Sequence, residues 1–175
     1  PLDRPANLAE HLTRRGFALT VQAAAMVFDP QAQPGAAPSA QVVVEVQDPS
    51  QYGKWSEVMC RSFDLPEEVA EIGRRALATE AVRLYLAHRG GEPAGTAILY
   101  SRSGLGYVDL VGTLPEHRRQ GVARALTARV VADSVRQGNR WTALEVDCES
   151  PAERIYSEAG FRRTHLRPRY VHPVG

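Results

Sequence analysis

Residues 113–124 read Thr-Leu-Pro-Glu-His-Arg-Arg-Gln-Gly-Val-Ala-Arg, and this stretch decides what the chain can be. It joins a strand-like run at 106–113 to the clearest helical pattern of the sequence, at 121–137. Cationic side chains are unfavourable at a helix N-terminus, which carries partial positive charge and unpaired N–H groups. Two arginines and a histidine precede this helix, and only Glu116 offsets them. A bound anion would resolve the conflict, and Gly121 would let it approach the backbone; a solvated basic loop is the alternative.

The pattern of the 121–137 helix predicts which of its sides is buried. Val122, Leu126 and Val130 form one apolar stripe, whereas Asp133 is expected on the solvent-exposed side. Gly138 is the expected end of the helix. Gly112, inside the preceding strand, indicates a bulge or a close approach of a ligand to the backbone.

Downstream of this unit the sequence predicts a strand, a short helix and a last strand, at 141–147, 150–159 and 161–171. Ser150 and Glu153 form a capping box around Pro151, so the helix begins there. Its buried stripe is expected at positions 152, 155 and 159, with Tyr156 at the edge of that stripe.

Upstream, alternating strand and helix signals favour one α/β domain. Strands are expected at 41–47, 82–88 and 94–102, with a hairpin turn at 89–93, and helices at 52–63 and 67–79. The first 40 residues differ: a short helix ends at Gly16, residues 17–28 look extended, and residues 29–40 have a linker composition of Pro, Ala and Gly. We therefore divide the chain into an N-terminal appendage, 1–40, and a domain, 41–175.

One internal similarity concerns the appendage. Arg15-Gly16-Phe17, followed by Met26-Val27, parallels Ala159-Gly160-Phe161, followed by Tyr170-Val171 at the same offsets. Helix–glycine–strand units are common, so chance is one explanation. The other is that residues 1–29 are the tail of a degenerate first copy of the domain. The chain begins with Pro1 rather than Met, which suggests a processed or truncated product.

Composition excludes several classes of protein. A hydrophobic fraction of 43% and a net charge of +1 favour a globular domain that binds no nucleic acid. No apolar run is long enough to span a membrane, and no secretory signal is visible. Cys60 and Cys148 suit a reducing, cytoplasmic compartment; we expect both to stay reduced and neither to be a nucleophile. Neither a zinc site nor any other metal site is expected.

The stretch 113–123 resembles the acyl-CoA signature of the GNAT superfamily of N-acyltransferases, whose core, Arg/Gln-x-x-Gly-x-Gly/Ala, is matched by Arg118, Gly121 and Ala123. Residues 156–161, Tyr-Ser-Glu-Ala-Gly-Phe, resemble the family's downstream Tyr-x-x-x-Gly-Phe signature. The resemblance covers about residues 41–172. It implies a mixed, mostly antiparallel sheet flanked by helices, here with an N-terminal helix–strand appendage.

The resemblance also implies a reaction: transfer of an acetyl group from acetyl-CoA, as co-substrate, to a primary amine that attacks the thioester directly. The residues that match the family's cofactor-binding positions are Val111, Gly112, Thr113, Arg118, Arg119, Gln120, Gly121, Val122, Ala123 and Arg124. The first three would offer backbone groups to the pantetheine arm, and the others would hold the pyrophosphate.

For catalysis, the resemblance makes Tyr156 the general acid for the leaving thiolate, with core packing as the alternative role. Glu145 matches a glutamate that some relatives use as general base; Asp109 is the second candidate, and a carboxylate satisfied by an arginine is the alternative for both. Many relatives work through water instead. Glu149 departs from the asparagine that many relatives carry, so that role is not transferred.

Two other functions remain open on the same fold. One is a non-catalytic acyl-CoA sensor or regulatory module, and the other is an acyltransferase for a longer acyl chain. The acceptor is a small-molecule or peptide amine that the sequence does not identify, and the protein is expected as a monomer or homodimer. The acceptor pocket is expected to involve Tyr52, Trp55, Phe63 and the acidic residues at 67, 68 and 71.

Overall fold

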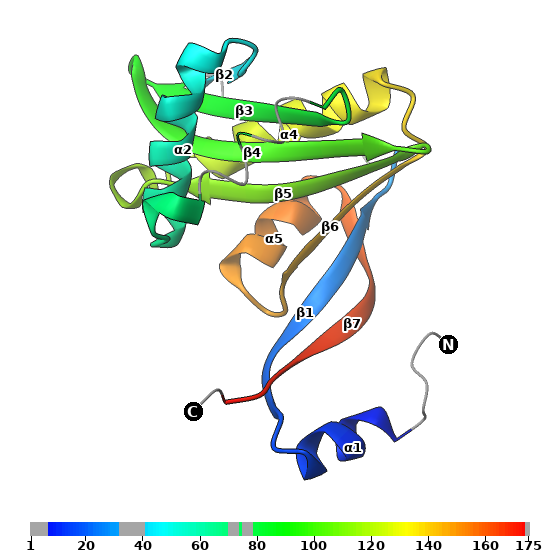
Figure 1. Ribbon diagram of the computed structural model, residues 1–175. Coiled ribbons are helices and arrows are strands. Elements are labelled where there is room, and N and C mark those ends of the chain that lie inside the picture. The colour runs from blue at the N-terminus through cyan, green and yellow to red at the C-terminus, as the bar shows by residue number, and fades with distance from the viewer. Residues whose placement is uncertain (1–6, 32–40, 70–73, 75–78, 174–175) are drawn as a thin grey trace.

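A computed structural model of the chain describes residues 7–31, 41–69, 74 and 79–173. These residues form one sheet in the order β2-β3-β4-β5-β6-β1-β7 (Figure 1). Every neighbouring pair is antiparallel except β5 and β6, which run parallel. The predicted mixed, mostly antiparallel sheet is therefore confirmed.

The elements follow the predicted order along the chain. The strands are β1 (Ala18–Phe28), β2 (Gln41–Glu45), β3 (Val82–Arg89), β4 (Glu92–Arg102), β5 (Leu105–Thr113), β6 (Trp141–Asp147) and β7 (Phe161–Val171). The helices are α1 (Leu8–Arg14), α2 (Pro49–Phe63), α4 (Val122–Arg136) and α5 (Pro151–Glu158), with 3₁₀ turns η1 (Glu67–Val69) and η2 (Pro115–His117). The helix predicted at 67–79 lies mostly outside the described residues, as does most of the linker at 29–40.

Helices cover both faces of the sheet, and each face has its own core. On β3 the side chains alternate, so that Leu84 and Leu86 belong to the core under α2, and Tyr85 and Ala87 to the core under α4. Trp55 of α2 is completely buried, and its indole N–H donates to the carbonyl oxygen of Tyr85 at 3.1 Å. Figure 1 shows α2 across the near face and α4 behind the strands.

The prediction for Asp133 of α4 is wrong. Its side chain is buried rather than solvent-exposed, and its carboxylate accepts hydrogen bonds from Arg129 and Arg136. Arg129 also donates to the carbonyl oxygen of Val43 on β2. A buried carboxylate is tolerated when it is paired. Arg129 and Arg136, which lie four residues before and three residues after Asp133 on the same helix, supply that pairing.

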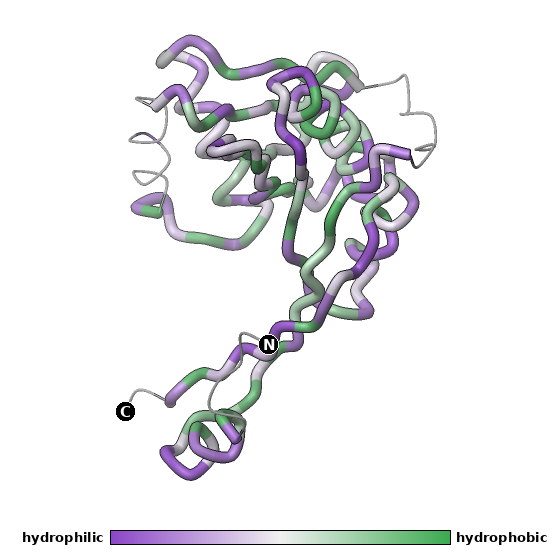
Figure 2. Tube along the Cα trace, turned by 90° about the vertical axis from the view of Figure 1, so that its right-hand side faces the viewer, coloured by the Kyte–Doolittle hydropathy of each residue, from purple (hydrophilic) through white to green (hydrophobic). Residues whose placement is uncertain are grey.

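The strand predicted in the appendage forms, and it lies inside the sheet, next to the edge strand β7. β1 lies between β6 and β7, so residues 18–28 share a sheet with the domain expected at 41–175. Ala23, Ala24 and Ala25 occupy the part that is paired on both edges, where small side chains allow the flanking strands' long side chains to meet. The rest of β1, the end of β7 and α1 extend away from the body as an arm in both views (Figures 1 and 2). Among the described residues, no helix is both long and apolar enough for a membrane span.

Candidate active site

Strands β5 and β6 diverge, and this divergence creates the site. The two strands pair only from Leu105 with Trp141 to Val108 with Leu144. Beyond that point, residues 109–113 of β5 continue beside β4 and have no strand partner on the β6 side. Figure 1 shows the two strands opening from a common end. The open edge contains Val111, Gly112 and Thr113, which were predicted to bind the cofactor.

A bulge lies within this open edge, as Gly112 indicated. Between Thr96 and Ile98 of β4, the register jumps from Gly112 to Asp109, which leaves Leu110 and Val111 opposite one residue. Leu110 has a positive φ of 46°, and its N–H is bonded by the Asp109 side chain at 2.8 Å. A Cβ at Gly112 would lie 2.7 Å from side-chain atoms of Ser62 and Phe63. The close approach at this glycine is therefore made by the end of α2.

The loop after β5 leads to a helix N-terminus that lacks a side-chain cap. Gly121 is the N-cap of α4 with φ 84°, a left-handed conformation that glycine adopts without strain. No side chain accepts a hydrogen bond at this cap, and the first turn has no acidic residue. Arg119, also at positive φ, precedes it. Backbone N–H groups at such a start are free to bind an anion.

The cations of this loop have different partners. Arg118 donates to the carbonyl oxygens of Thr113 and Ser62, each at 3.4 Å, and Arg124 pairs with Glu158 of α5. Within the described part of the chain, Arg119 is exposed and forms no ion pair. Glu116 pairs with Arg61 of α2 instead, at 2.8 Å. The carboxylate thought to offset the loop's charge is thus already committed elsewhere.

Tyr156 packs in the core of α5 more deeply than predicted. Its side chain is 8% exposed and makes an edge-on contact with Phe161, with ring centroids 5.9 Å apart. The expected stripe of Ala152, Ile155 and Ala159 is only partly buried. Burial, and then the negative charge of Asp109, raise the pKa of the Tyr156 phenol above its ordinary value. The hydroxyl therefore stays protonated at neutral pH, in a field set by Asp109 of the open edge.

Glu145 and Asp109 lie one residue beyond the last pair between β5 and β6. Glu145 forms ion pairs with Arg167 and with Arg169, the latter at 3.6 Å. These arginines come from β7 and reach Glu145 across the alanines of β1. The ion pair is the alternative role foreseen for this glutamate. Asp109 is exposed. Burial is the largest cause that raises the pKa of Tyr107, and the negative charges of Glu145 and Asp109 raise it further.

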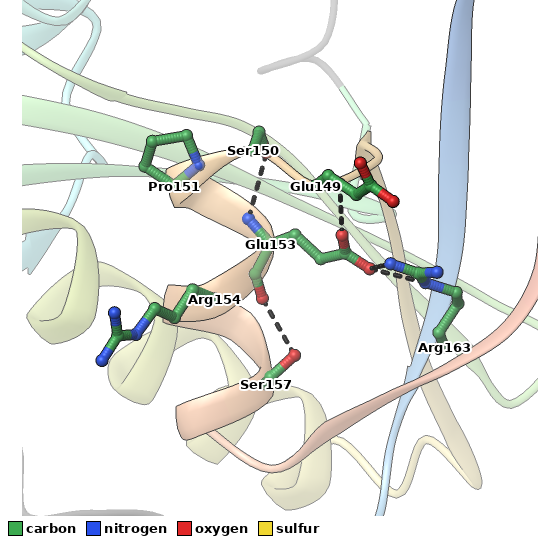
Figure 3. Close-up of a pocket in the computed structure, with 7 residues that line it drawn as sticks. All are labelled: Glu149, Ser150, Pro151, Glu153, Arg154, Ser157 and Arg163. Carbon is green, nitrogen blue, oxygen red and sulfur yellow. Dashed lines mark hydrogen bonds and ion pairs between the residues drawn. The ribbon is translucent and has the colours of Figure 1, made fainter.

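The N-terminus of α5 is satisfied within the chain, as Figure 3 shows. The Ser150 hydroxyl accepts from the N–H of Glu153 at 3.2 Å, which confirms the predicted cap. The Glu153 carboxylate accepts from the N–H of Glu149 at 2.6 Å and from Arg163 of β7. Burial acts to raise the pKa of Glu153, but these two donors outweigh it and lower that pKa. Only the fold brings in Arg163, which the sequence analysis did not single out.

Other predicted residues lie elsewhere. Tyr52 and Trp55 are buried core residues of α2, whereas Phe63 is 40% exposed. Glu67 and Glu68 lie in η1, and residue 71 is outside the described residues. The thiol of Cys60 donates to the carbonyl oxygen of Pro66 at 3.6 Å, and neither Cys60 nor Cys148 forms a disulfide among the described residues. Among the described residues, no group of three or more His, Cys, Asp or Glu could hold a metal ion.

Comparisons with known proteins agree with this geometry. Residues 53–172 match the model of the acetyltransferase (GNAT) domain family. No curated protein sequence matches the chain significantly. Similar solved structures include a GCN5-related N-acetyltransferase from Kribbella flavida (TM-score 0.75, 19% identity, 97% of this chain and 65% of that chain). A GCN5-related N-acetyltransferase from Sphaerobacter thermophilus is also similar (TM-score 0.75, 22% identity, 93% of this chain and 54% of that chain).

A third similar structure is AAC(6')-Iy in complex with a bisubstrate analogue, CoA-S-monomethyl-acetylneamine (TM-score 0.63, 19% identity, 73% of this chain and 94% of that chain). At these identities the likeness concerns the fold. The chain spans less than two thirds of the length of the Kribbella and Sphaerobacter proteins. The family match covers more than half of the chain, and the diverging strands and the basic helix start carry its signature. The chain therefore belongs to the GNAT acetyltransferase family.

Proposed function

We propose that this protein transfers an acetyl group from acetyl-CoA to a primary amine of a small molecule or peptide. The observation that carries the proposal is the uncapped, basic start of α4 beside the open edge of β5. An anionic group bound there would be stabilised by backbone N–H groups and by free cationic side chains. The CoA-containing analogue bound to AAC(6')-Iy supports the choice of ligand.

Two adjoining segments would hold the co-substrate. The pyrophosphate-binding segment comprises Arg118, Arg119, Gln120, Gly121, Val122, Ala123 and Arg124. Of its side chains, Arg119 is exposed and free of ion pairs among the described residues, and it would supply direct charge. The second segment is the open edge at Val111, Gly112 and Thr113, whose backbone groups would bind the pantetheine arm in the way that a neighbouring strand binds.

Tyr156 would protonate the departing thiolate as the amine nitrogen bonds to the carbonyl carbon and the carbon–sulfur bond breaks. A proton donor must be protonated before the step, as a phenol is at neutral pH; burial raises the pKa of Tyr156 further, which holds the proton more tightly and makes the phenol a weaker acid. Core packing fixes the ring, since Phe161 contacts one side of it.

Glu145 is the proposed acceptor of the amine proton, with Asp109 as the competing group. The ion pairs of Glu145 favour a positioning role, because a proton would have to displace Arg167 or Arg169. Asp109 is exposed and its charge reaches Tyr156. The variants Glu145→Gln and Asp109→Asn distinguish the two residues. Replacing the true base should lower activity most at low pH, and that activity should recover as pH rises, because the amine is then deprotonated without help.

The same ion pairs favour a second candidate, an acyl-CoA sensor without turnover. In that case Tyr156 is a core residue and Glu145 a structural one. The deciding experiment measures thiol release from acetyl-CoA with a panel of amines, peptide amino termini and aminoglycosides. Thiol release that depends on an amine supports the transferase. Saturable CoA binding with no release under any amine contradicts it and supports the sensor.

We further propose a cytoplasmic location, supported by the two cysteines, Cys60 and Cys148, which form no disulfide among the described residues. The proposed transfer needs no acyl-enzyme, so neither thiol should carry an acetyl group. Mass spectrometry of the protein after a single turnover tests this point. An acetylated cysteine would replace direct attack with a two-step mechanism.

A further inference from the structure

The arm made by α1, β1 and β7 has an internal two-fold symmetry. Each pair of the ladder consists of one β1 residue and one β7 residue. Adding 144 to the β1 residue number and subtracting 144 from the β7 residue number gives another pair of the same ladder. Ala18–Val171 becomes Val27–Arg162, Leu19–Tyr170 becomes Met26–Arg163, Val21–Arg169 becomes Ala25–His165, Gln22–Pro168 becomes Ala24–Leu166, and Ala23–Arg167 becomes itself. The axis therefore passes between Ala23 and Arg167.

The irregularities of the ladder obey the same symmetry. The register shifts by one residue at Thr20 of β1 and at Thr164 of β7, which are 144 residues apart. The Thr20 hydroxyl donates to the carbonyl oxygen of Arg169 at 3.2 Å, and the Thr164 hydroxyl donates to that of Ala25 at 3.1 Å. These two bonds are equivalents under the axis. A chance similarity of helix–glycine–strand units would not reproduce matching bulges and matching side-chain bonds.

The helices that lead into the two strands match as well. The N–H of Gly16 bonds to the carbonyl oxygen of Thr13 at 3.0 Å, and that of Gly160 to Ser157 at 3.1 Å. Both glycines have positive φ. Outside the ladder, Phe17 contacts His172 edge-on, as Phe28 contacts Phe161. Thus α1–β1 is the two-fold equivalent of α5–β7.

The two units differ in what they pack against. α5 contacts α4 and β6 and buries Tyr156, whereas α1 buries none of its residues. The outer edge of β7 has no neighbouring strand among the described residues, and residues 162–169 are all exposed. Apolar side chains on the arm are exposed too: Leu8, Leu19, Leu166 and Val171. Among the described residues, α1 thus has no packed body like the one that α4 and β6 provide for α5.

We propose that α1–β1 is the last helix–strand unit of a second GNAT-fold domain joined ahead of α1, and that this domain's equivalent of β6 pairs with the outer edge of β7. The two domains would then share one sheet about the axis between Ala23 and Arg167. The structures from Kribbella and Sphaerobacter are longer than this chain, which covers 65% and 54% of them.

A second copy of the present chain does not fit the same edge. Its β6 is already paired, with β5 on one edge and with its own β1 on the other. The proposed domain differs, because its last unit would be α1–β1, and β1 already pairs with β6 and β7 of the present chain. One edge of that domain's own equivalent of β6 would therefore be free to pair with β7. The competing outcome is a protected free edge, since Pro168 and the arginines of β7 are residues that block strand addition.

The test is a tandem protein built from this chain's own sequence, with residues 41–150 placed directly ahead of residue 7. By the symmetry, residue 143 of the added body lies opposite Val171. We expect Val171→Cys, combined with Ala143→Cys in the added body, to form an internal disulfide in a monomeric protein. The matched control moves the second cysteine to Asp147 of the added body, roughly 13 Å further along the strand, where no disulfide should form.

Absence of the disulfide at position 143, or equal yield at both positions, overturns the proposal. A second variant covers misfolding of the tandem: residues 151–172 of the 175-residue chain are replaced by residues 7–28. If the units are equivalent, this protein folds, with circular dichroism like that of the parent. If it unfolds, the equivalence is wrong. If it folds while the tandem does not, the outer edge of β7 is no docking surface.

Discussion

The two helices that follow the diverging strands begin in opposite ways. α5 follows β6 and begins with Ser150, whose hydroxyl accepts from Glu153, while Glu153 in turn holds the N–H of Glu149 and Arg163. α4 follows β5 and begins with Gly121, which has no side chain to cap the helix. Its first turn has no acid, and cations precede it. The α5 start is capped by the chain's own side chains, whereas the α4 start has no side-chain cap and is the one that we propose binds an anion.

This difference gives a physical criterion for distinguishing a structural helix start from one proposed to bind a ligand. Unpaired N–H groups and unopposed positive charge cost free energy in the folded protein unless something binds them. Where the chain provides the partners, as at α5, the helix start fixes geometry. Where it does not, as at α4, the start is available to a ligand. The predictions below test this division.

The largest effect is expected on the turnover rate when Tyr156 is changed. This residue lies on α5, whose capped start fixes its position. Tyr156→Phe keeps the ring packed against Phe161 and removes only the hydroxyl. General acid catalysis typically contributes about 10²–10⁴-fold, so kcat should fall within that range while CoA affinity barely changes. Steady-state kinetics and calorimetric binding measure both. A variant that loses stability and binding, with no selective loss of rate, would make Tyr156 a core residue only.

The second effect is on CoA affinity, at the α4 start. Gly121→Glu places a carboxylate where an anion should bind, and like-charge juxtaposition costs several kcal/mol, so affinity should fall by about 100-fold or more. The matched control is Gly138→Glu, at the other end of α4. Gly138 has a similar positive φ of 77°, so the backbone strain is comparable, and a Cβ added there would have no atom within 4 Å; it lies at the helix C-terminus, where no anion site is proposed. Equal affinity of both variants for CoA would refute the anion site.

A smaller effect is expected on stability, at the α5 cap. Ser150→Ala removes the acceptor for the N–H of Glu153, which typically lowers the free energy of unfolding by about 1 kcal/mol. CoA affinity should remain that of the parent, in contrast to Gly121→Glu. Chemical denaturation and binding titrations on the same preparation give the two values. A Ser150→Ala protein that is fully stable but binds CoA weakly would reverse the assignment of the two helix starts.

The smallest effect concerns pH and Glu153. Its pKa is lowered in the folded protein, so the unfolded chain binds the proton more readily as pH falls. The stabilisation is complete well above the ordinary value of 4.5 and is lost as pH falls through and below that value. Melting temperatures measured from pH 7 to pH 3 should therefore fall less steeply in Glu153→Gln than in the parent. Glu10→Gln, on the exposed face of the arm, is the control; an equal slope in all three proteins would contradict the prediction.

Much of the fold could be predicted because its signals are local. The hairpin turn at 89–93, the apolar stripe of α4 and the Ser150 cap of α5 each depend on residues a few positions apart. The anion site is a prediction from a signal of the same kind, since the conflict between the arginines and the helix start lies within residues 117–124. Asp133 was assigned to the wrong face because its charge was given more weight than its spacing: position 133 lies three residues after Val130 and seven after Leu126, which places it on the apolar stripe.

What the sequence by itself determined is the order of elements, the family signature and the unbalanced charge at the start of α4. Only the tertiary structure decided that Glu145 is held by Arg167 and Arg169, that α2 fills the space at Gly112, and that β1 lies between β6 and β7. The physical reason is distance along the chain. A helix start is stabilised by its neighbours in sequence, whereas a strand is stabilised by partner strands that are often distant: β1 meets β7 about 144 residues away, through backbone hydrogen bonds that any residue with an N–H can make.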